Sequence, residues 1–252
     1  MPHVTGDTDY GLVGTAYTRT RRTDPRIATL VHAALGDART IVNVGAGAGS
    51  YEPLDRHVLP VEPSPAMRAQ RPAHLAPAIH GVAEHLPFDD DSVDAAMAMV
   101  TVHQWPDAVA GLREMRRVAR GPVVVLTFDG DELDRLWLMD HVPELRVAEA
   151  ARYPAVDTIT RTLGPGTRVQ PVPIPVDCVD GFTEAYYARP EAFLDPAVRR
   201  AQSAWTFLEP GVEERAMATL AADLASGAWD ERYGSLRTQP EFHGAVRLIL
   251  SP

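Results

Sequence analysis

The sequence predicts an α/β fold built on a mostly parallel sheet. Short apolar runs alternate with helical patterns through the first half of the chain, as they do when crossover helices join parallel strands. A glycine-rich turn follows the first of these runs directly. The chain has 252 residues, enough for one large domain or two small ones, and we expect a single domain over 1–252.

The elements of the first half are predicted in a regular order. A helix over 27–35 ends at Gly36, and a later helix over 107–119 ends before Gly121 and Pro122. A further helix begins at about residue 65. Strands are predicted over 40–44, 58–61, 78–82, 93–102 and 123–128.

The second half is less regular. Residues 169–176 alternate with prolines, which suits a strand at the edge or end of the sheet. Helices are predicted over 133–145, 196–208 and 212–226, and a last strand over 245–250. We expect seven strands in all. Residues 38–128 would form the core of the fold, while 129–168 and 177–243 would cover the carboxyl edge of the sheet, where ligands of open α/β sheets bind.

Composition excludes several classes of protein. The chain has 24 basic and 34 acidic residues, a net charge of −10, so nucleic acid is not expected as its main partner. No apolar run is long enough for a membrane span, and the first ten residues do not resemble a secretory signal, so we expect a cytoplasmic protein. Cys178 is the one cysteine and the histidines are scattered along the chain, so we expect no metal site.

The glycine turn carries the strongest signal. The strand at 40–44 runs into Gly45-Ala46-Gly47-Ala48-Gly49. Glycines at alternate positions let the backbone turn sharply and approach a ligand with no Cβ in the way. The next strand ends at Glu62, 17 residues after Gly45. An acid at the tip of the second strand can accept hydrogen bonds from both ribose hydroxyls of an adenosine.

Two further blocks complete the pattern. Ala83-Glu84-His85-Leu86-Pro87-Phe88 follows the third predicted strand, and His103-Gln104-Trp105 follows the fourth. Together the four blocks resemble the class I S-adenosylmethionine-dependent methyltransferases, in the subgroup of small-molecule enzymes with a GxGxG turn and an AExLPF segment. This resemblance covers roughly residues 38–128 and implies a Rossmann-like fold, with S-adenosylmethionine as cofactor.

The resemblance also implies roles for individual residues. The glycine turn would pass beneath the methionine moiety and ribose, Glu62 would hold the ribose hydroxyls, and Tyr17 would reach the methionine carboxylate. The other implied positions surround adenine or the sulfonium. The implied cofactor residues are Tyr17, Asn43, Gly45, Ala46, Gly47, Glu62, Pro63, Met67, Ala83, Glu84, Met99 and Val100.

Two departures from the family pattern stand out. Asn43 occupies a position where the family usually has an acid that organises the turn and the ligand's ammonium. In addition, only 12 residues separate Gly49 from Glu62, so the first crossover helix must shrink to a turn or so. We expect an intact cofactor site that is more open on that side.

Methyl transfer is a direct displacement, so a base is needed only when the acceptor must lose a proton. His103 follows the strand whose end should form the floor beneath the methyl group, and histidine titrates near neutral pH. Asp129 follows the fifth strand at the same edge, where it could instead cap a helix. His103 is our first candidate base and Asp129 the second. Aromatic residues of the second half are candidate walls of an acceptor pocket, or core residues: Trp137, Tyr186, Tyr187 and Trp205.

The predicted function is transfer of a methyl group to oxygen, nitrogen or carbon of a small molecule, with secondary metabolism as one source of that molecule. The alternative is a protein of the same fold that binds the cofactor without transferring a methyl group. Such a protein would act as a natural-product cyclase or a binding subunit. Asn43 and the absence of a certain base keep this alternative open.

Overall fold

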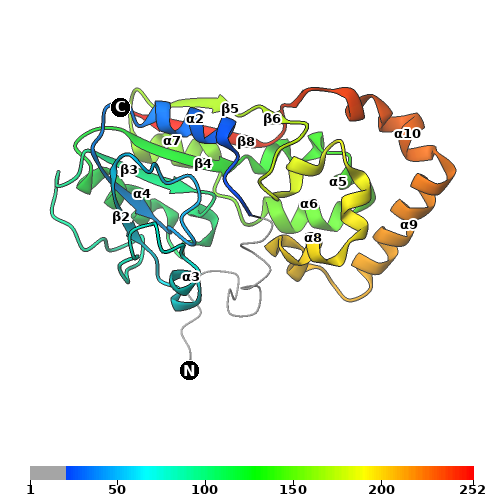
Figure 1. Ribbon diagram of the computed structural model, residues 1–252, viewed down its shortest axis with the longest axis horizontal. Helices are drawn as coiled ribbons and strands as arrows, with labels where there is room; N and C mark the ends of the chain where they lie inside the picture. Colours follow the sequence, from blue (N-terminus) through cyan, green and yellow to red (C-terminus); the bar gives the residue numbers. More distant parts are fainter. Residues whose placement is uncertain (1–20) are drawn as a thin grey trace.

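A six-stranded sheet forms the centre of the computed structural model, which describes residues 21–252 (Figure 1). The strands lie in the order β2-β1-β3-β4-β8-β5, and β8 runs antiparallel to β4 and β5 while the pairs among β1–β4 are parallel. The mostly parallel α/β fold is therefore confirmed. The strands of this sheet are β1 (Thr40–Val44), β2 (His57–Val61), β3 (Ala95–Met99), β4 (Val123–Phe128), β5 (Arg168–Pro171) and β8 (Val246–Ser251).

The strand predicted over 78–82 is wrong. In that segment a single parallel bridge, between Val61 and Ile79, extends the sheet beyond β2. Ile79 is 41% exposed, so the segment has little apolar surface to bury, and Gly81 weakens a strand further. The strand predicted over 93–102 is also shorter, since β3 ends at Met99 and a 3₁₀ turn, η1 (Val102–Gln104), follows.

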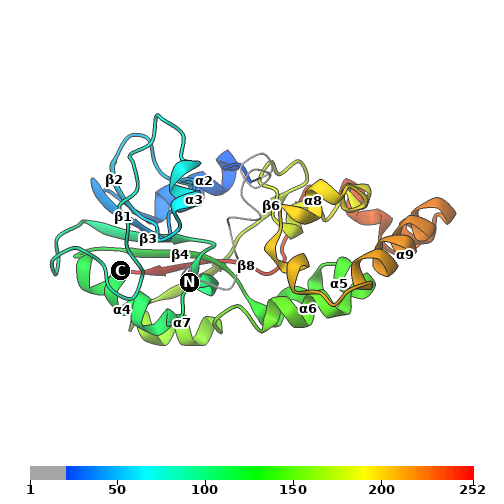
Figure 2. The same ribbon diagram turned by 90° about the horizontal axis from the view of Figure 1, so that it is seen from below.

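Helices cover both faces of the sheet (Figure 2). One face packs against α4 (Ala108–Val118) and α7 (Val156–Leu163), and the other against α2 (Pro25–Ala34). Alternate residues of β4 serve the two faces, as the period of a strand requires: Val123 and Val125 point to α4, while Val124 and Leu126 point to the side of α2. The expectation that 129–168 covers the carboxyl edge does not describe α7, which packs beside α4 on a sheet face.

The crossover from β1 to β2 contains no helix, as its length predicts. The chain passes through turns from residue 45 to 56 and enters β2 directly. After β2, α3 (Pro65–Ala69) begins with the Ser64 side chain accepting from the amide of Met67. This short helix begins the connection from β2 to β3, and its Met67 lies beside the glycine turn.

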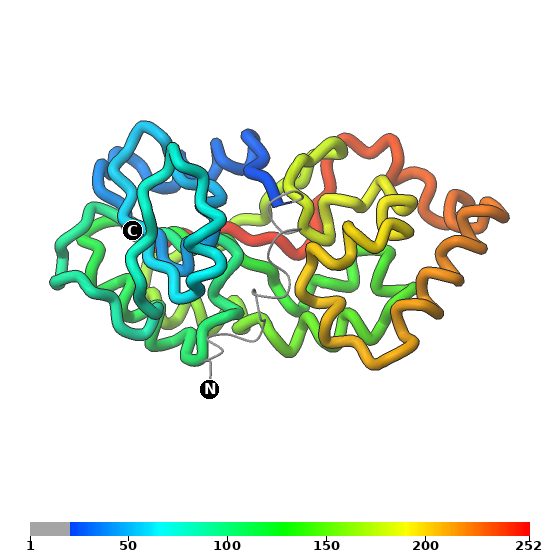
Figure 3. Tube along the Cα trace, turned by 60° about the horizontal axis from the view of Figure 1, so that its bottom comes forward, coloured from blue at the N-terminus to red at the C-terminus, as the bar shows by residue number. Residues whose placement is uncertain are grey.

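A second group of helices lies beyond the sheet's carboxyl edge (Figures 1 and 3). We call residues 130–150 and 177–238 the helical region. Its elements are η2 (Gly130–Arg135), α5 (Leu138–His141), α6 (Pro143–Ala150), η3 (Thr183–Tyr186), η4 (Pro190–Leu194), α8 (Pro196–Arg200), η5 (Ser203–Phe207), α9 (Val212–Ser226), α10 (Ala228–Tyr233) and η6 (Gly234–Thr238). Two short strands, β6 (Ile174–Pro175) and β7 (Glu241–Phe242), join it to the sheet.

The helical region is more broken than the sequence predicts. The helix expected over 133–145 is three elements, because Pro143 cannot continue a helix and Val142 before it leaves the helical conformation. The helix expected over 196–208 ends at Arg200, and Gln202 is extended. By contrast, α9 matches its predicted bounds. None of the helices within 21–252 is both long and apolar enough to cross a bilayer.

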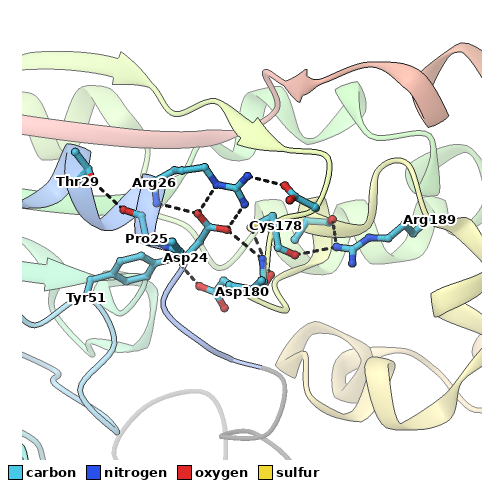
Figure 4. A network of polar contacts seen from close by, with 11 residues as sticks. Asp24, Pro25, Arg26, Thr29, Tyr51, Cys178, Asp180 and Arg189 are labelled. Carbon is cyan, nitrogen blue, oxygen red and sulfur yellow. Dashed lines mark hydrogen bonds and ion pairs between the residues drawn. The ribbon is translucent and has the colours of Figure 1, made fainter.

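A buried polar network joins the start of α2 to the segment 177–180 (Figure 4). The fully buried Asp24 carboxylate accepts from the Arg26 side chain at 2.7 and 3.0 Å and from the Val179 amide at 3.1 Å. Burial alone would raise the pKa of Asp24, but these bonds lower it to about 2. Nearby, the Tyr51 hydroxyl donates to Asp180 at 2.7 Å, so the loop after the glycine turn is tied to the same segment.

Candidate functional site

A cleft of about 880 Å³ opens where β1, β2 and β3 end. The chain moves from β1 to β2 on one side and later places β3 on the other side of β1, so the strand order reverses there. In open α/β sheets, ligands bind at such a switch point, outside the carboxyl ends of the strands. Gly45, Glu62 and Val100, each following one of these strands, line the cleft.

The two glycines of the turn that line the cleft are Gly45 and Gly47. Gly45 has φ +66°, and a Cβ there would overlap the Thr101 side chain. Gly47 has φ +50°, and its Cβ would lie 3.3 Å from Met67 Cε. Both conformations are left-handed and favour glycine. The turn therefore lies directly on the cleft wall, with backbone rather than side chains exposed to a ligand.

Glu62 supports this turn from the tip of β2. Its carboxylate is buried, and it accepts from the amides of Gly47 and Ser64, each at 2.8 Å. Burial raises the pKa of Glu62, and the two amide bonds oppose that shift. A carboxylate has about four acceptor sites, so about two remain for hydroxyl groups of a ligand. Glu62 can thus brace the turn and bind a ribose together.

Asn43 stands beside a buried ion pair. Its Nδ2 donates to Glu52 Oε1 at 2.8 Å, and Arg71 donates to the same carboxylate at 2.8 and 3.0 Å. Arg71 also donates to the Gly47 carbonyl at 3.2 Å. A carboxylate therefore lies next to the position where the family usually has an acid. Asn43 Oδ1 is buried and has no hydrogen-bond partner among the described residues, so it can accept from an ammonium group.

The structure brings the predicted cofactor residues together. Each one within 21–252 lines the cleft: Asn43, Gly45, Ala46, Gly47, Glu62, Pro63, Met67, Ala83, Glu84, Met99 and Val100. Tyr17 lies outside the described residues. Sequence reasoning missed Thr101, Gln104 and Trp105 on the same wall. Their position directly after β3 was the available signal, since the ends of parallel strands meet at one edge.

A second cavity, of about 630 Å³, adjoins the first across Val100, which lines both. Its aromatic walls are Phe128, Tyr153 and Phe182, with ring centroids 5.4 and 5.8 Å from Phe128. Val100 has φ +53°, a strained conformation for a β-branched residue. Its amide still donates to the Leu126 carbonyl at 2.7 Å, so the chain leaves the sheet abruptly after this bond.

His103 lines this second cavity and not the first. Its ring packs 4.7 Å from that of Tyr153, and its Nε2 lies 2.8 Å from Gln104 Nε2. His103 is thus positioned beside the cavity, with one nitrogen engaged by a neighbour.

The other residues considered for the acceptor lie elsewhere. Asp129 lines neither cavity: it caps η2 through the Asp131 amide at 3.2 Å and pairs with Arg247 at 3.6 Å. Trp137, Tyr187 and Trp205 are buried in the core. Within 21–252, no three metal-ligating side chains come together.

Comparisons with known proteins agree with this geometry. A family model described as "Methyltransferase domain" matches residues 42–125. A crystal structure of a protein described as a methyltransferase from an antibiotic biosynthesis pathway of Anabaena variabilis is 30% identical, covers 92% of this chain and 99% of that one, and superposes with a TM-score of 0.84. The chain therefore belongs to the class I S-adenosylmethionine-dependent methyltransferases.

Two more distant similarities have a narrower meaning. An uncharacterized methyltransferase of Mycobacterium tuberculosis is 36% identical over 91 residues, which is 33% of this chain and 36% of the relative. The match thus spans about a third of that curated relative's length. The cyclase SpnF is 15% identical, with 96% of this chain and 93% of that one covered and a TM-score of 0.55. At that identity, the likeness shows a shared fold alone.

Proposed function

We propose that this protein transfers a methyl group from S-adenosylmethionine to a small molecule bound in the second cavity. The observation that carries the proposal is the first cleft, where the glycine turn, Glu62 and the orphaned Asn43 Oδ1 meet. Glu62 would hold the ribose hydroxyls, and Asn43 Oδ1 would accept from the ammonium of the methionine moiety. When bound, S-adenosylmethionine supplies an electrophilic methyl group.

The chain's own contribution is alignment and exclusion of water. Val100 lines both cavities, so a cofactor in the first and an acceptor in the second would meet beside it. Holding two reactants in line can lower a barrier by about 7–11 kcal/mol, so no further catalytic group is required for a nucleophile that is already deprotonated. For a hydroxyl or carbon acid, His103 is the proposed base, because it lines the second cavity.

The acceptor class follows from the cavity and from one relative. Phe128, Tyr153 and Phe182 and a few polar side chains line the cavity, a mixture typical of small-molecule sites. The Anabaena variabilis protein is described as belonging to an antibiotic biosynthesis pathway, which supports an acceptor from secondary metabolism. The net charge of −10 gives no support to a nucleic-acid substrate.

Radiolabelled methyl transfer tests the proposal. The protein is incubated with methyl-labelled S-adenosylmethionine and fractions of a bacterial small-molecule extract, and labelled products are counted. We expect label in at least one fraction, and at least about tenfold less of it with the Glu62→Ala variant at a limiting cofactor concentration. Binding of S-adenosylmethionine without any labelled product in a broad set of extracts would instead favour the cyclase or binding-subunit alternative.

A further inference from the structure

The segment Gly181-Phe182-Thr183-Glu184 brings a buried carboxylate to the second cavity. Glu184 is 1% exposed and lines the cavity from η3. Its Oε1 accepts from the amide of Ala245 at 2.7 Å, just before β8. Its Oε2 is buried and has no hydrogen-bond partner among residues 21–252. An unsatisfied carboxylate oxygen is costlier to bury than an unsatisfied neutral group, so a hydrogen-bond donor is expected to occupy it.

The backbone opposite is shaped to admit this carboxylate. A Cβ on Gly244 would overlap Glu184 Oε1 and crowd its other oxygen. Gly244 has no left-handed φ, so the absent side chain is what the site requires. Burial raises the pKa of Glu184 to about 7, with the Ala245 and Val246 amides and the more distant Arg247 and Arg135 opposing that shift.

Gln202 lines the same cavity and, within the part of the chain that the structure describes, has an unpartnered donor, where Glu184 has an unpartnered acceptor. It is 6% exposed, and its Oε1 accepts from Thr183 Oγ1 at 2.8 Å and from Trp205 Nε1 at 3.2 Å. Two donors on the oxygen fix the orientation of the amide. Its Nε2 is therefore left as a buried donor, and it has no partner among the described residues. Two residues that line the cavity, Glu184 and Gln202, thus each have one buried polar atom without a partner within 21–252, an acceptor in the first and a donor in the second, on walls that also carry Phe128 and Phe182.

We propose that Glu184 and Gln202 are the polar groups that select the methyl acceptor. The acceptor they fit is a small, largely apolar or aromatic molecule with a hydroxyl or amine to donate to Glu184 Oε2. It also carries a carbonyl or other oxygen to accept from Gln202 Nε2. Naming this the methyl acceptor rests on the proposed function; the recognition of such a molecule does not. The other charged groups on the wall are engaged within the protein, Arg21 with Asp180 and Glu149 with Arg152.

The Glu184→Gln variant gives a test that misfolding cannot imitate. The backbone N–H of Ala245 still needs an acceptor. The new glutamine side chain is therefore expected to keep its oxygen on that N–H and to turn its NH₂ group toward the cavity. The polarity of that point is then reversed. Fragments that donate should lose affinity by tenfold or more, an expectation based on the loss of one charge-assisted bond, about 1.5–3 kcal/mol. Matched fragments that carry only a hydrogen-bond acceptor should keep their affinity or bind more tightly.

The probes are four sets of monocyclic aromatic fragments: donor with acceptor, donor only, acceptor only, and neither. Ligand-observed NMR at about pH 9, where the Glu184 carboxyl is ionised, measures their binding to the wild type, to Glu184→Gln and to Glu191→Gln. The last is a control on the exposed ion pair with Arg237, outside the cavity. Wild type and control should prefer the donor-with-acceptor set, while Glu184→Gln should prefer the acceptor-only set.

Calorimetry with S-adenosylhomocysteine separates this inference from the proposed function. Glu184→Gln should bind it as the wild type does, which also shows that the variant is folded. An unchanged ranking of the four sets in Glu184→Gln overturns the inference, and so does the absence of any donor preference in the wild type. Failure of the wild type to bind S-adenosylhomocysteine contradicts the proposed function and leaves the polarity result standing.

Discussion

The cleft proposed to hold the cofactor (the cofactor cleft) and the second cavity, proposed to hold the acceptor (the acceptor cavity), are built by different means. The cleft is formed by residues at the ends of β1, β2 and β3, whose positions are set by the backbone hydrogen bonds of the sheet. Much of the cavity wall comes from 3₁₀ turns, and its polar groups are fixed by one or two side-chain hydrogen bonds, such as that of Glu184 with the Ala245 amide. A sheet edge therefore gives a stable place for a common cofactor, while short turns let the acceptor pocket differ between relatives.

The largest effect is expected at the glycine turn. In Gly47→Val a branched side chain would enter the cleft, so binding of S-adenosylmethionine should fall below detection by calorimetry while circular dichroism shows a folded protein. Gly227→Val is the matched control. Gly227 also has a left-handed φ, +85°, but it joins α9 to α10 with open space around it. Both variants bear backbone strain of about 1–2 kcal/mol, and only the first should lose the cofactor. Equal affinities for the two would remove the glycine turn from the site.

His103 tests which side of the shared wall performs the chemistry. If it is the base, His103→Ala should lower kcat by about 10²–10⁴ and leave cofactor affinity nearly unchanged, because it lines the acceptor cavity alone. Steady-state kinetics with the identified acceptor measures both quantities. His103→Asn keeps a polar group of similar reach that cannot take a proton. Full activity of the Asn variant would mean that His103 only orients the acceptor.

Glu62 should contribute equally to the binding of S-adenosylmethionine and of its demethylated product. Glu62→Ala removes the acceptor for the ribose and for the Gly47 amide, so affinity for S-adenosylmethionine and S-adenosylhomocysteine should fall alike, by roughly tenfold to a thousandfold. The ribose does not change during transfer, so the loss should appear in the cofactor KM rather than kcat. An unchanged KM would place the ribose elsewhere.

The smallest effect concerns stability and its pH dependence. The pKa of Glu184 is about 7 in the folded protein and near 4.5 when unfolded, so the folded state binds its proton more tightly. Stability from this group is full below about pH 4.5 and is lost as pH rises through 7. Glu184→Gln, which is always neutral, should therefore gain stability relative to wild type between pH 4.5 and 8, by up to about 3 kcal/mol. Denaturant unfolding of both proteins at about pH 4.5 and about pH 8 measures this gain in stability. A stability difference between the two proteins that does not change with pH would contradict the raised pKa of Glu184.

The two regions also differ in how far the sequence predicts them. Valine-rich β4 and the glycine turn have local signals, and their bounds and placement agree with the structure. The cavity has no comparable signal. Glu184 and Gln202 are ordinary polar residues in sequence, and only the contacts with Ala245 and Thr183, far along the chain, show which of their atoms remain unsatisfied. Trp137 and Trp205 are candidates for a pocket wall by size alone, and in the structure they pack in the hydrophobic core.

The strained Val100 has a thermodynamic consequence. The chain leaves β3 at Val100, and the two neighbouring residues His103 and Gln104 then line different cavities. Gln104 lines the cofactor cleft, and His103 lines the acceptor cavity. Their side chains meet at 2.8 Å. A ligand that moves Gln104 must disturb His103, and the reverse holds with the same free energy, because linkage between two binding sites is reciprocal. Affinity for the acceptor should therefore differ between the empty protein and the protein carrying S-adenosylhomocysteine.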